Sequence, residues 1–317
     1  MKYLILFVIF FILQFLYFKI ANKFNIIDKP NQRSSHKDVT LRGGGIIFYI
    51  GVLSYFIMSG FQYPWFFAGL TLIAGISFVD DLQPRSATLR LFIHFSAILL
   101  MFYQWNGLSY SWYFIIAGLV LCAGILNVYN FMDGINGITG GYSLILIFAL
   151  WYINNYQVIF IDNELLHIIG LTLLVFNFFN FRTNAKCFAG DIGAMSIAFT
   201  LVFLLGTLII TTKDFSYIIL LGIYGVDAVL TIIHRLMLKE NILVAHRMHI
   251  YQIMANELNI PHIIVSLIYM LLQTIIIIGL FIAFEYKWLY LVCVLLLLSI
   301  VYMIFIKKYF HLYQPSS

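Results

Sequence analysis

Charged residues are scarce in this chain. Asp, Glu, Lys and Arg make up 10% of its 317 residues, whereas 63% are hydrophobic, and the mean hydropathy is +0.98. This balance excludes a soluble domain. A membrane-spanning helix needs about 20 mostly apolar residues, so the length admits about ten or eleven such helices with short connections. No room is left for a sizeable extramembrane domain.

Cysteine is also rare. Cys122, Cys187 and Cys293 are scattered along the sequence, which predicts neither a disulfide framework nor a metal cluster. The N-terminal apolar run of residues 1–20 is too long for a secretory signal and lacks a cleavage site of small residues, so we interpret it as a retained first span. The sequence shows no short repeat, low-complexity tract or linker. Residues 1–317 are therefore predicted to form a single membrane domain.

The apolar runs predict an all-α, polytopic integral membrane protein with about eleven transmembrane helices. Turn-forming residues such as Gly60, Pro64, Asn106 and Gly107 separate them. The predicted spans cover residues 1–22, 44–60, 64–79, 88–105, 110–127, 138–154, 164–181, 192–211, 216–236, 262–284 and 288–306.

The basic residues predict how these spans are oriented. All but three of the 18 Lys and Arg residues fall on one side of the predicted topology, the exceptions being Lys2, Lys213 and Lys287. Cytoplasmic loops of membrane proteins carry the excess of Lys and Arg. The N-terminus is therefore predicted to lie outside and the C-terminus in the cytoplasm.

The same orientation brings every polar cluster to the cytoplasmic face, although it was derived from basic residues alone. A carboxylate at the centre of a bilayer costs roughly 2.5–3.5 kcal/mol on insertion scales, so acids at the mouths of membrane helices are candidates for function. We predict one cytoplasmic site, built from catalytic loops over residues 25–45, 80–88, 128–137, 182–191 and 237–261.

Four aspartates lie at or inside the ends of spans. Asp80 and Asp81 are adjacent, and neighbouring helical side chains point about 100° apart, so one can face a ligand while the other organises it; a solvated turn that ends the span is the alternative. Asp191 lies where the eighth span begins, where an N-cap is the simpler reading. Asp227 lies within the ninth span, as a candidate ligand or as a partner in a helix–helix hydrogen bond.

A fifth aspartate, Asp133, lies in the glycine-rich loop N-F-M-D-G-I-N-G-I-T-G-G. Its glycines permit close backbone approach, and Asn130 and Asn136 supply amide donors and acceptors. Such a loop before a helix can bind a nucleotide, a sugar or a phosphate through backbone N–H groups. A helix-packing face of small residues is the alternative.

Basic and histidine side chains surround these acids. Attraction to anionic lipids explains their charge, but not the histidines or the triple glycine Gly43–Gly45 beside them. A zinc site is not favoured, because the last loop offers two histidines without a third ligand. The predicted substrate-binding residues of this kind are Arg33, His36, Arg42, Lys186, His246, Arg247 and His249.

An acidic centre with a basic rim suits an anion that arrives with a divalent cation. Mg²⁺ prefers one or two carboxylates plus substrate phosphates, and phosphoryl transfer needs mainly positioning and charge neutralisation. The lipid-embedded location indicates that one substrate is a membrane lipid.

In their order along the chain, these motifs resemble those of the polyprenyl-phosphate N-acetylhexosamine-1-phosphate transferase family (glycosyltransferase family 4). The similarity runs from about Asp28 to Gln252. The matching pieces are D-K-P-N-x-R-S-S-H with R-G-G-G, then D-D, N-x-x-N-F-M-D-G-I-N-G, F-x-G-D-x-G and the histidine loop.

The resemblance implies transfer of a sugar-1-phosphate from a UDP-N-acetylhexosamine to undecaprenyl phosphate, with release of UMP, by a multi-pass protein of the bacterial inner membrane. Asp80 and Asp81 match the family's aspartate pair, which is linked to metal handling and to the lipid phosphate. Asp191 matches its Mg²⁺-binding aspartate, and Asn130 and Asp133 match its nucleotide-sugar loop. We therefore expect Mg²⁺, with Mn²⁺ as a substitute, at Asp191 and Asp81.

These interpretations define the predicted site. Its catalytic residues are Asp80, Asp81, Asp133 and Asp191. Its substrate-binding residues are Arg33, His36, Arg42, Asn130, Asn136, Lys186, Asp227, His246, Arg247 and His249. Membrane lipids are expected partners, nucleic acid is not, and a homodimer is left open.

The histidine loop, H-R-M-H-I-Y-Q, narrows the resemblance. Tyr251 takes the second position of H-x-H, whereas relatives that use a MurNAc-pentapeptide carry consecutive histidines and the enterobacterial GlcNAc-1-phosphate transferase carries H-I-H. The string resembles the branch that starts lipopolysaccharide O-antigen and related surface polysaccharides. It leaves UDP-GlcNAc, UDP-GalNAc and UDP-6-deoxy-HexNAc sugars such as UDP-FucNAc or UDP-QuiNAc open as donors.

Two other functions remain to be weighed. An ion-coupled secondary transporter would place its acids near the bilayer midplane, often in two corresponding halves, whereas here they lie at one face. A catalytically silent scaffold would not need to retain Asp80, Asp81, Asp133 and Asp191.

Overall fold

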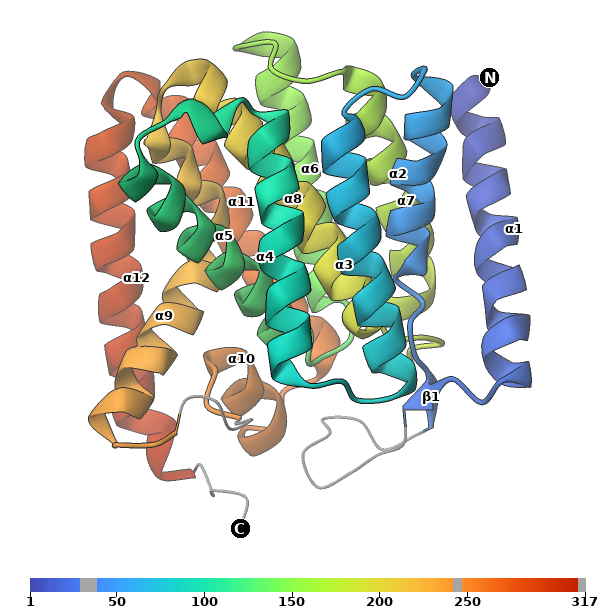
Figure 1. Cartoon of the computed structure of the whole chain (residues 1–317). Coiled ribbons are helices and arrows are strands. Elements are labelled where there is room, and N and C mark those ends of the chain that lie inside the picture. Colours follow the sequence, from blue (N-terminus) through green and yellow to red (C-terminus); the bar gives the residue numbers. More distant parts are fainter. Residues whose placement is uncertain (29–38, 242–246, 313–317) are drawn as a thin grey trace.

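The computed structural model describes residues 1–28, 39–241 and 247–312, and this part of the chain is a bundle of long helices (Figure 1). The long helices are α1 (Lys2–Lys23), α2 (Ile46–Met58), α3 (Pro64–Leu82), α4 (Ala87–Gln104), α5 (Trp112–Met132), α6 (Ile138–Tyr156), α7 (Asn163–Asn180), α8 (Gly190–Thr212), α9 (Gly222–Met237), α11 (His262–Ile282) and α12 (Lys287–Tyr309). The short elements are β1 (Ile27–Asp28), β2 (Thr40–Leu41), η1 (Gly107–Ser109), η2 (Phe215–Leu221), α10 (Ile250–Gln252), η3 (Ile253–Glu257), η4 (Phe284–Tyr286) and η5 (Phe310–Leu312).

Each predicted span corresponds to one of these helices, which confirms the all-α polytopic class. Within the described ranges, nine helical segments are long and apolar enough to cross a membrane. The two predicted spans outside that set are α2 and α6. With 13 residues, α2 is only about 20 Å long. The first turns of α6, from Ile138 to Ser143, are buried and rich in small and polar residues, because they face other helices rather than lipid.

The central helix of the bundle is α8. Of its most apolar window 83% is buried, compared with 22% for α1 and for α5. It packs against α2, α3, α5 and α6, and small residues permit close contact: Gly69 of α3 lies against the ring of Phe199. The N-terminus of α8 is therefore surrounded by other elements, and it is there that Asp191 lies.

The predicted span 216–236 is divided. A 3₁₀ segment, η2, leads into α9, which leaves the bundle at its own angle (Figure 1). A break frees backbone groups that need partners at membrane depth. Gln273 of α11 supplies them: its Oε1 accepts a hydrogen bond from the N–H of Ile223 at 3.2 Å, and its Nε2 donates to the carbonyl of Ile219 at 3.2 Å.

The polar segments gather at one end of the bundle. β1, α10 and the connection from α3 to α4 lie there, opposite the start of α1, and α12 returns to the same end (Figure 1). β1 pairs antiparallel with β2, Ile27 opposite Leu41, which leads the chain to Arg42. The first and last described helical residues thus lie at opposite ends, as an odd number of crossings requires. That the polar end faces the cytoplasm stays a prediction from the basic residues.

Candidate active site

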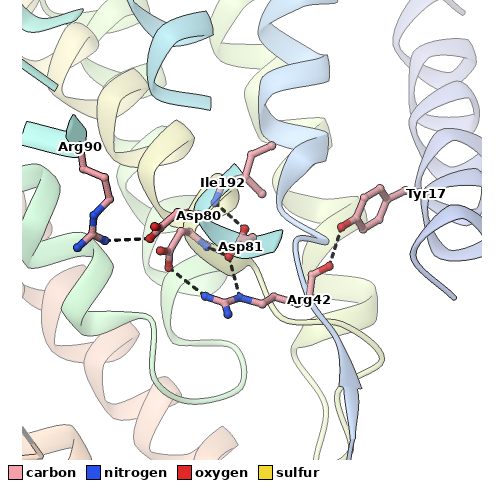
Figure 2. A network of polar contacts seen from close by, with 7 residues as sticks. Tyr17, Arg42, Asp80, Asp81, Arg90 and Ile192 are labelled. Carbon is pink, nitrogen blue, oxygen red and sulfur yellow. Dashed lines mark hydrogen bonds and ion pairs between the residues drawn. The ribbon is translucent and has the colours of Figure 1, made fainter. Parts of the chain in front are cut away.

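Asp81 joins the end of α3 to the start of α8 (Figure 2). Its Oδ1 accepts a hydrogen bond from the N–H of Asp191 at 2.9 Å, and its Oδ2 accepts one from the N–H of Ile192 at 3.1 Å. The first N–H groups of a helix have no partner inside the helix, and a carboxylate at this position also interacts favourably with the helix dipole. Because its side chain has no exposed surface, Asp81 is held at the helix end and is not presented to solvent.

Arg42 stands between two aspartates. Its Nε lies 2.7 Å from Oδ1 of Asp81, and its Nη2 lies 3.5 Å from Oδ1 of Asp191. The carbonyl of Arg42 accepts a hydrogen bond from the hydroxyl of Tyr17 at 2.6 Å, which ties the end of β2 to α1 (Figure 2). The side chains of Arg42 and Asp191 are 33% and 22% exposed. These two are therefore the accessible part of the group, and Asp81 is its buried anchor.

The triple glycine allows two backbone segments to lie in direct contact. Gly43–Gly45 precedes α2, and the N–H of Gly44 donates to the carbonyl of Phe188 at 2.8 Å. A Cβ on Gly45 would collide with the Cα of Gly193 in the first turn of α8. Glycine is required because α2 and α8 begin against each other. This close approach is what places Arg42 beside the N-terminus of α8.

Asp80 has different partners from its neighbour. Its Oδ2 accepts a hydrogen bond from Nη1 of Arg90 at 2.9 Å (Figure 2). Its Oδ1 accepts one from the N–H of Arg85 at 2.6 Å. Asp80 and Asp81 thus point in different directions, as expected for adjacent helical residues. Arg90 was not predicted as a site residue, because its charge was used only to orient the spans. Arg90 lies in the first turn of α4 and was predicted to be on the same side of the membrane as Asp80. This position was the available signal for a pairing of the two.

Asp133 lies beside this cluster, where α5 ends. Burial raises the pKa of Asp133 to about 6; the hydroxyl of Thr139 opposes the rise, the charge of Asp81 adds to it, and the cation of Arg42 opposes it. The charges of Asp81 and Arg42 act on this carboxyl group, so the glycine-rich loop lies close to the cluster. Asn130, half-buried, lies in the last turn of α5, and its carbonyl accepts the N–H of Asp133 at 3.3 Å.

Two asparagines tie the glycine-rich loop to the segment before α8. The Nδ2 of Asn136 donates to the carbonyl of Arg182 at 2.9 Å. Asn180 accepts the N–H of Gly137 at 2.8 Å and donates to the carbonyl of Cys187 at 2.9 Å. Both side chains are buried. Asn136 therefore links two loops with its amide nitrogen, while its Oδ1 has no partner among the described residues.

Asp227 holds the histidine segment from inside the bundle. Its Oδ1 accepts the N–H of Ile250 at 3.0 Å and lies 3.5 Å from Nδ1 of His249, and its Oδ2 accepts the hydroxyl of Tyr269 at 2.6 Å. Asp227 is 3% exposed and His249 is 1% exposed. The structure thus places both of these predicted substrate-binding residues beneath the surface of the segment.

The remaining predicted residues differ in accessibility. Lys186 is exposed and Arg247 is half-buried. Arg33, His36 and His246 lie outside the described residues.

A cavity of about 600 Å³ lies beside the cluster, within the range of small-molecule sites, about 300–1,000 Å³. Three of its walls belong to segments that lead to the cluster: β2 precedes Arg42, residues 183–188 precede Asp191, and Asn136 follows Asp133. The start of α11, at Pro261–Ile263, forms another wall, and Lys186 lies on the lining.

The donor set fits a Mg²⁺ ion that is shared with phosphates. In the described parts of the chain, no group of three or more His, Cys, Asp or Glu residues is arranged to hold a metal by itself, and Mg²⁺ uses one or two carboxylates plus substrate phosphates. The side chain of Asp191 is partly exposed, and the carboxyl group of Asp80 lies within hydrogen-bonding reach of it. Asp81 has other partners, since its oxygens contact Arg42 and the N–H groups of Asp191 and Ile192.

Some residues that build the site carried a weak signal in the sequence. Gln14 of α1 is fully buried and donates through Nε2 to the carbonyl of Gly44 at 3.1 Å. Tyr269 and Gln273 of α11 are buried in a similar way. Each is a polar side chain in an otherwise apolar span, which is costly unless a partner is present. That cost was the available signal, although none of the three residues was predicted.

The sequence matches a known protein family over its central part. The model of glycosyl transferase family 4 matches residues 63–212, from the start of α3 to the end of α8, and so includes Asp80, Asp81, Asp133 and Asp191. The match covers just under half of the chain and makes this sequence similar to glycosyl transferase family 4. The family resemblance of the sequence motifs is thereby confirmed.

Three curated relatives of this chain have related names. One from Bacillus subtilis (strain 168), named probable undecaprenyl-phosphate N-acetylglucosaminyl 1-phosphate transferase, is 25% identical over 74% of this chain and 70% of its own length. Proteins named undecaprenyl-phosphate alpha-N-acetylglucosaminyl 1-phosphate transferase, from Escherichia coli O157:H7 and Yersinia pestis, are 29% and 26% identical over 60% and 59% of this chain. The matched regions span 58% and 56% of these two relatives.

Proposed function

We propose that the protein transfers an N-acetylhexosamine-1-phosphate from a UDP-sugar to undecaprenyl phosphate, and so starts a lipid-linked surface glycan. An oxygen of the lipid phosphate would form a bond to the β-phosphorus of the UDP-sugar. The bond from that phosphorus to the bridging oxygen would break, and UMP would leave with the bridging oxygen. The observation that carries the proposal is the meeting of Arg42, Asp81 and Asp191 at the N-terminus of α8, in a chain similar to this family.

The cluster supplies what this reaction needs. Arg42 uses Nε and Nη2 toward the two aspartates, and a guanidinium has five N–H donors in all, so its remaining donors are available for a phosphate oxygen. Asp81 fixes Arg42 and the start of α8. A lipid phosphate is already ionised near neutral pH, so attack on phosphorus requires positioning and charge neutralisation more than a strong base.

We also propose Mg²⁺ as the cofactor, with Mn²⁺ as a substitute. Asp191 would hold it, with Asp80 and the predicted second ligand Asp81 beside it. When bound, the ion would neutralise charge on the diphosphate. The fit of Asp191 supports this proposal, because it combines an accessible carboxylate with a neighbouring carboxyl group.

The cavity beside the cluster is the best candidate for the nucleotide of the donor. Its lining joins the loop of Asn136 to the segment before Asp191, so a nucleotide placed there would direct its phosphates toward Arg42. The unpartnered Oδ1 of Asn136 could accept a hydrogen bond from an N–H or O–H group of the ligand. Lys186 would add positive charge at the edge.

The donor sugar and the pathway are finer proposals. The names of the relatives favour UDP-GlcNAc as the first donor to test. The H-I-Y form of the histidine segment still favours a protein of O-antigen or related surface-polysaccharide synthesis in a bacterial inner membrane. Tyr251 gives this branch a distinct contact between the histidine segment and the glycine-rich loop. Its buried ring lies against Gly134, and its hydroxyl donates to the carbonyl of Phe131 at 2.7 Å.

The test is a transfer assay with purified protein, Mg²⁺ and undecaprenyl phosphate. UMP release is expected with at least one donor among UDP-GlcNAc, UDP-GalNAc and 6-deoxy-HexNAc sugars, and EDTA is expected to stop it. Because one diphosphate is exchanged for another, added UMP should also drive the reverse reaction. No exchange in either direction with any of these donors would contradict the proposal. The ion-coupled transporter is not favoured, because the acids lie at one end of the bundle.

A further inference from the structure

A stripe of polar side chains follows one face of α11. His262, Ser266, Tyr269 and Gln273 are spaced by four, three and four residues, which places them in line on a helix. As a whole, α11 is long and apolar enough to cross a membrane. Ser266 and Gln273 are 0% exposed and Tyr269 is 4% exposed. Buried polar groups in a membrane helix need protein partners, so the partners show what the stripe does.

The first part of the stripe contacts the glycine-rich loop. The hydroxyl of Ser266 donates to the carbonyl of Asn136 at 2.8 Å, and Nδ1 of His262 lies 3.5 Å from the backbone nitrogen of the same residue. Both backbone polar groups of Asn136 therefore face α11, and these contacts hold the glycine-rich loop at the N-terminal end of this helix.

The next part of the stripe contacts the histidine segment through Asp227. Tyr269 donates to Oδ2 of Asp227 at 2.6 Å, and Oδ1 of Asp227 accepts the N–H of Ile250 at 3.0 Å and the hydroxyl of Thr231 at 3.3 Å. Both carboxylate oxygens are thus used by the protein. One buried carboxylate connects α11, α9 and the start of α10.

We infer that Asp227 and Tyr269 form an anchor that positions residues 247–257 against the glycine-rich loop, and that they are positioning residues of the donor site. Tyr251 completes the connection, since its hydroxyl donates to the carbonyl of Phe131 and its ring lies against Gly134. A displaced anchor would therefore shift both Arg247 and the loop of Asp133. The role in a donor site rests on the proposed function, whereas the anchoring of residues 247–257 rests only on the contacts described.

The anchor is tested by amide hydrogen exchange and by kinetics on the full chain in detergent micelles. Tyr269→Phe removes one hydroxyl, and Asp227→Asn removes the charge but keeps the shape. Tyr290→Phe is the matched control: Tyr290 lies on α12, and its hydroxyl donates to the carbonyl of Ile276 of α11 at 3.0 Å, not to Asp227. Loss of a hydrogen bond to a charged group should speed local opening by about tenfold to a hundredfold.

We expect amides of residues 247–257 to exchange about tenfold faster or more in Tyr269→Phe and Asp227→Asn, and at the wild-type rate in Tyr290→Phe. The double variant Asp227→Asn/Tyr269→Phe should add little to Asp227→Asn, because the two side chains act as one unit. In the transfer assay the KM for the UDP-sugar should rise several-fold, while the KM for undecaprenyl phosphate stays unchanged.

Three results would overturn the inference. Unchanged exchange of residues 247–257 in both variants would show that this segment is held by other contacts. Faster exchange with an unchanged donor KM would show that the segment is anchored but takes no part in the donor site. A loss of kcat without faster exchange would show that Asp227 acts on the reacting groups. Should wild-type protein prove inactive with every donor, the proposed function fails, and the exchange experiment alone decides the anchor.

Discussion

The carboxylate of Asp81 caps the very helix that carries Asp191, and its Oδ1 accepts the N–H of Asp191 at 2.9 Å. The two acids are therefore coupled, although they lie on different helices. Asp81 determines where α8 begins, and Asp191 is the partly exposed group that this placement makes available. A change at Asp81 is expected to move Asp191, whereas a change at Asp191 leaves the cap in place.

This relationship predicts different effects for two similar substitutions. Asp191→Asn should lower the rate of UMP release by at least about a hundredfold, because it removes charge stabilisation at the reacting phosphates, with little change in thermal unfolding. Asp81→Asn should lower the stability to unfolding by about 2–4 kcal/mol, because it leaves a helix end and Arg42 without their buried partner. Equal losses of stability in the two variants, measured by thermal unfolding in detergent, would refute this division of roles.

Metal binding at Asp191 can be observed without turnover. At a free Mg²⁺ concentration ten times its dissociation constant, the native state gains about 1.4 kcal/mol, which should raise Tm by about 2–5 °C. Asp191→Asn should abolish the shift. Asp214→Asn is the control, since Asp214 follows the far end of α8 and pairs with Lys287 at 2.6 Å. A shift that persists in Asp191→Asn would place the ion elsewhere.

The contact between α2 and α8 predicts a strong effect of a single methyl group. In Gly45→Ala the added Cβ would collide with the Cα of Gly193, so the two helices must separate and both stability and activity should fall. We expect a cost of about 1–3 kcal/mol in thermal unfolding, typical of overpacking. Gly75→Ala in α3 is the matched control, because its Cβ meets no atom within 4 Å; it should be neutral or slightly stabilising. Equal changes of stability in Gly45→Ala and Gly75→Ala would show that α2 and α8 do not require this close contact.

The raised pKa of Asp133 predicts a pH-dependent cost of stability. Its ordinary pKa is 3.8, and burial raises it to about 6 in the folded protein. Between these values the folded state binds more protons than the unfolded state, so stability falls as pH rises through this window. The contribution of the protonated acid is complete below about pH 4 and is lost above about pH 6.

Asp133→Asn removes this charge. The variant should be more stable than the wild type at pH 7.5, by up to about 3 kcal/mol, and equally stable near pH 4. Its activity should nevertheless fall, since Asp133 is a predicted catalytic residue. Denaturation profiles of both proteins between pH 4 and pH 8 give the measurement, and a difference that does not depend on pH would argue that burial of the ionised group is not the cause.

Much of the architecture followed from local patterns in the sequence. Long apolar runs separated by turn residues predicted the helices, because a helix in lipid satisfies its backbone internally and needs apolar side chains of sufficient length. The five segments around Arg42, Asp80, Asp133, Asp191 and His249 were also predicted to share one face, and the structure places them at one end of the bundle. Both results depend on hydropathy and charge counted along the chain.

The partners of each polar side chain were decided only by the tertiary structure. Nothing local distinguishes Asp80, which pairs with Arg90, from Asp81, which caps α8. Asn136 and Asp227 were predicted to contact substrate, and the structure shows that they hold backbone and side chains of other segments. Gln273 at the break before α9 was not foreseen at all. A polar group near a membrane needs a partner, and the sequence states that need, but only the packing of helices far apart in the chain determines which group meets it.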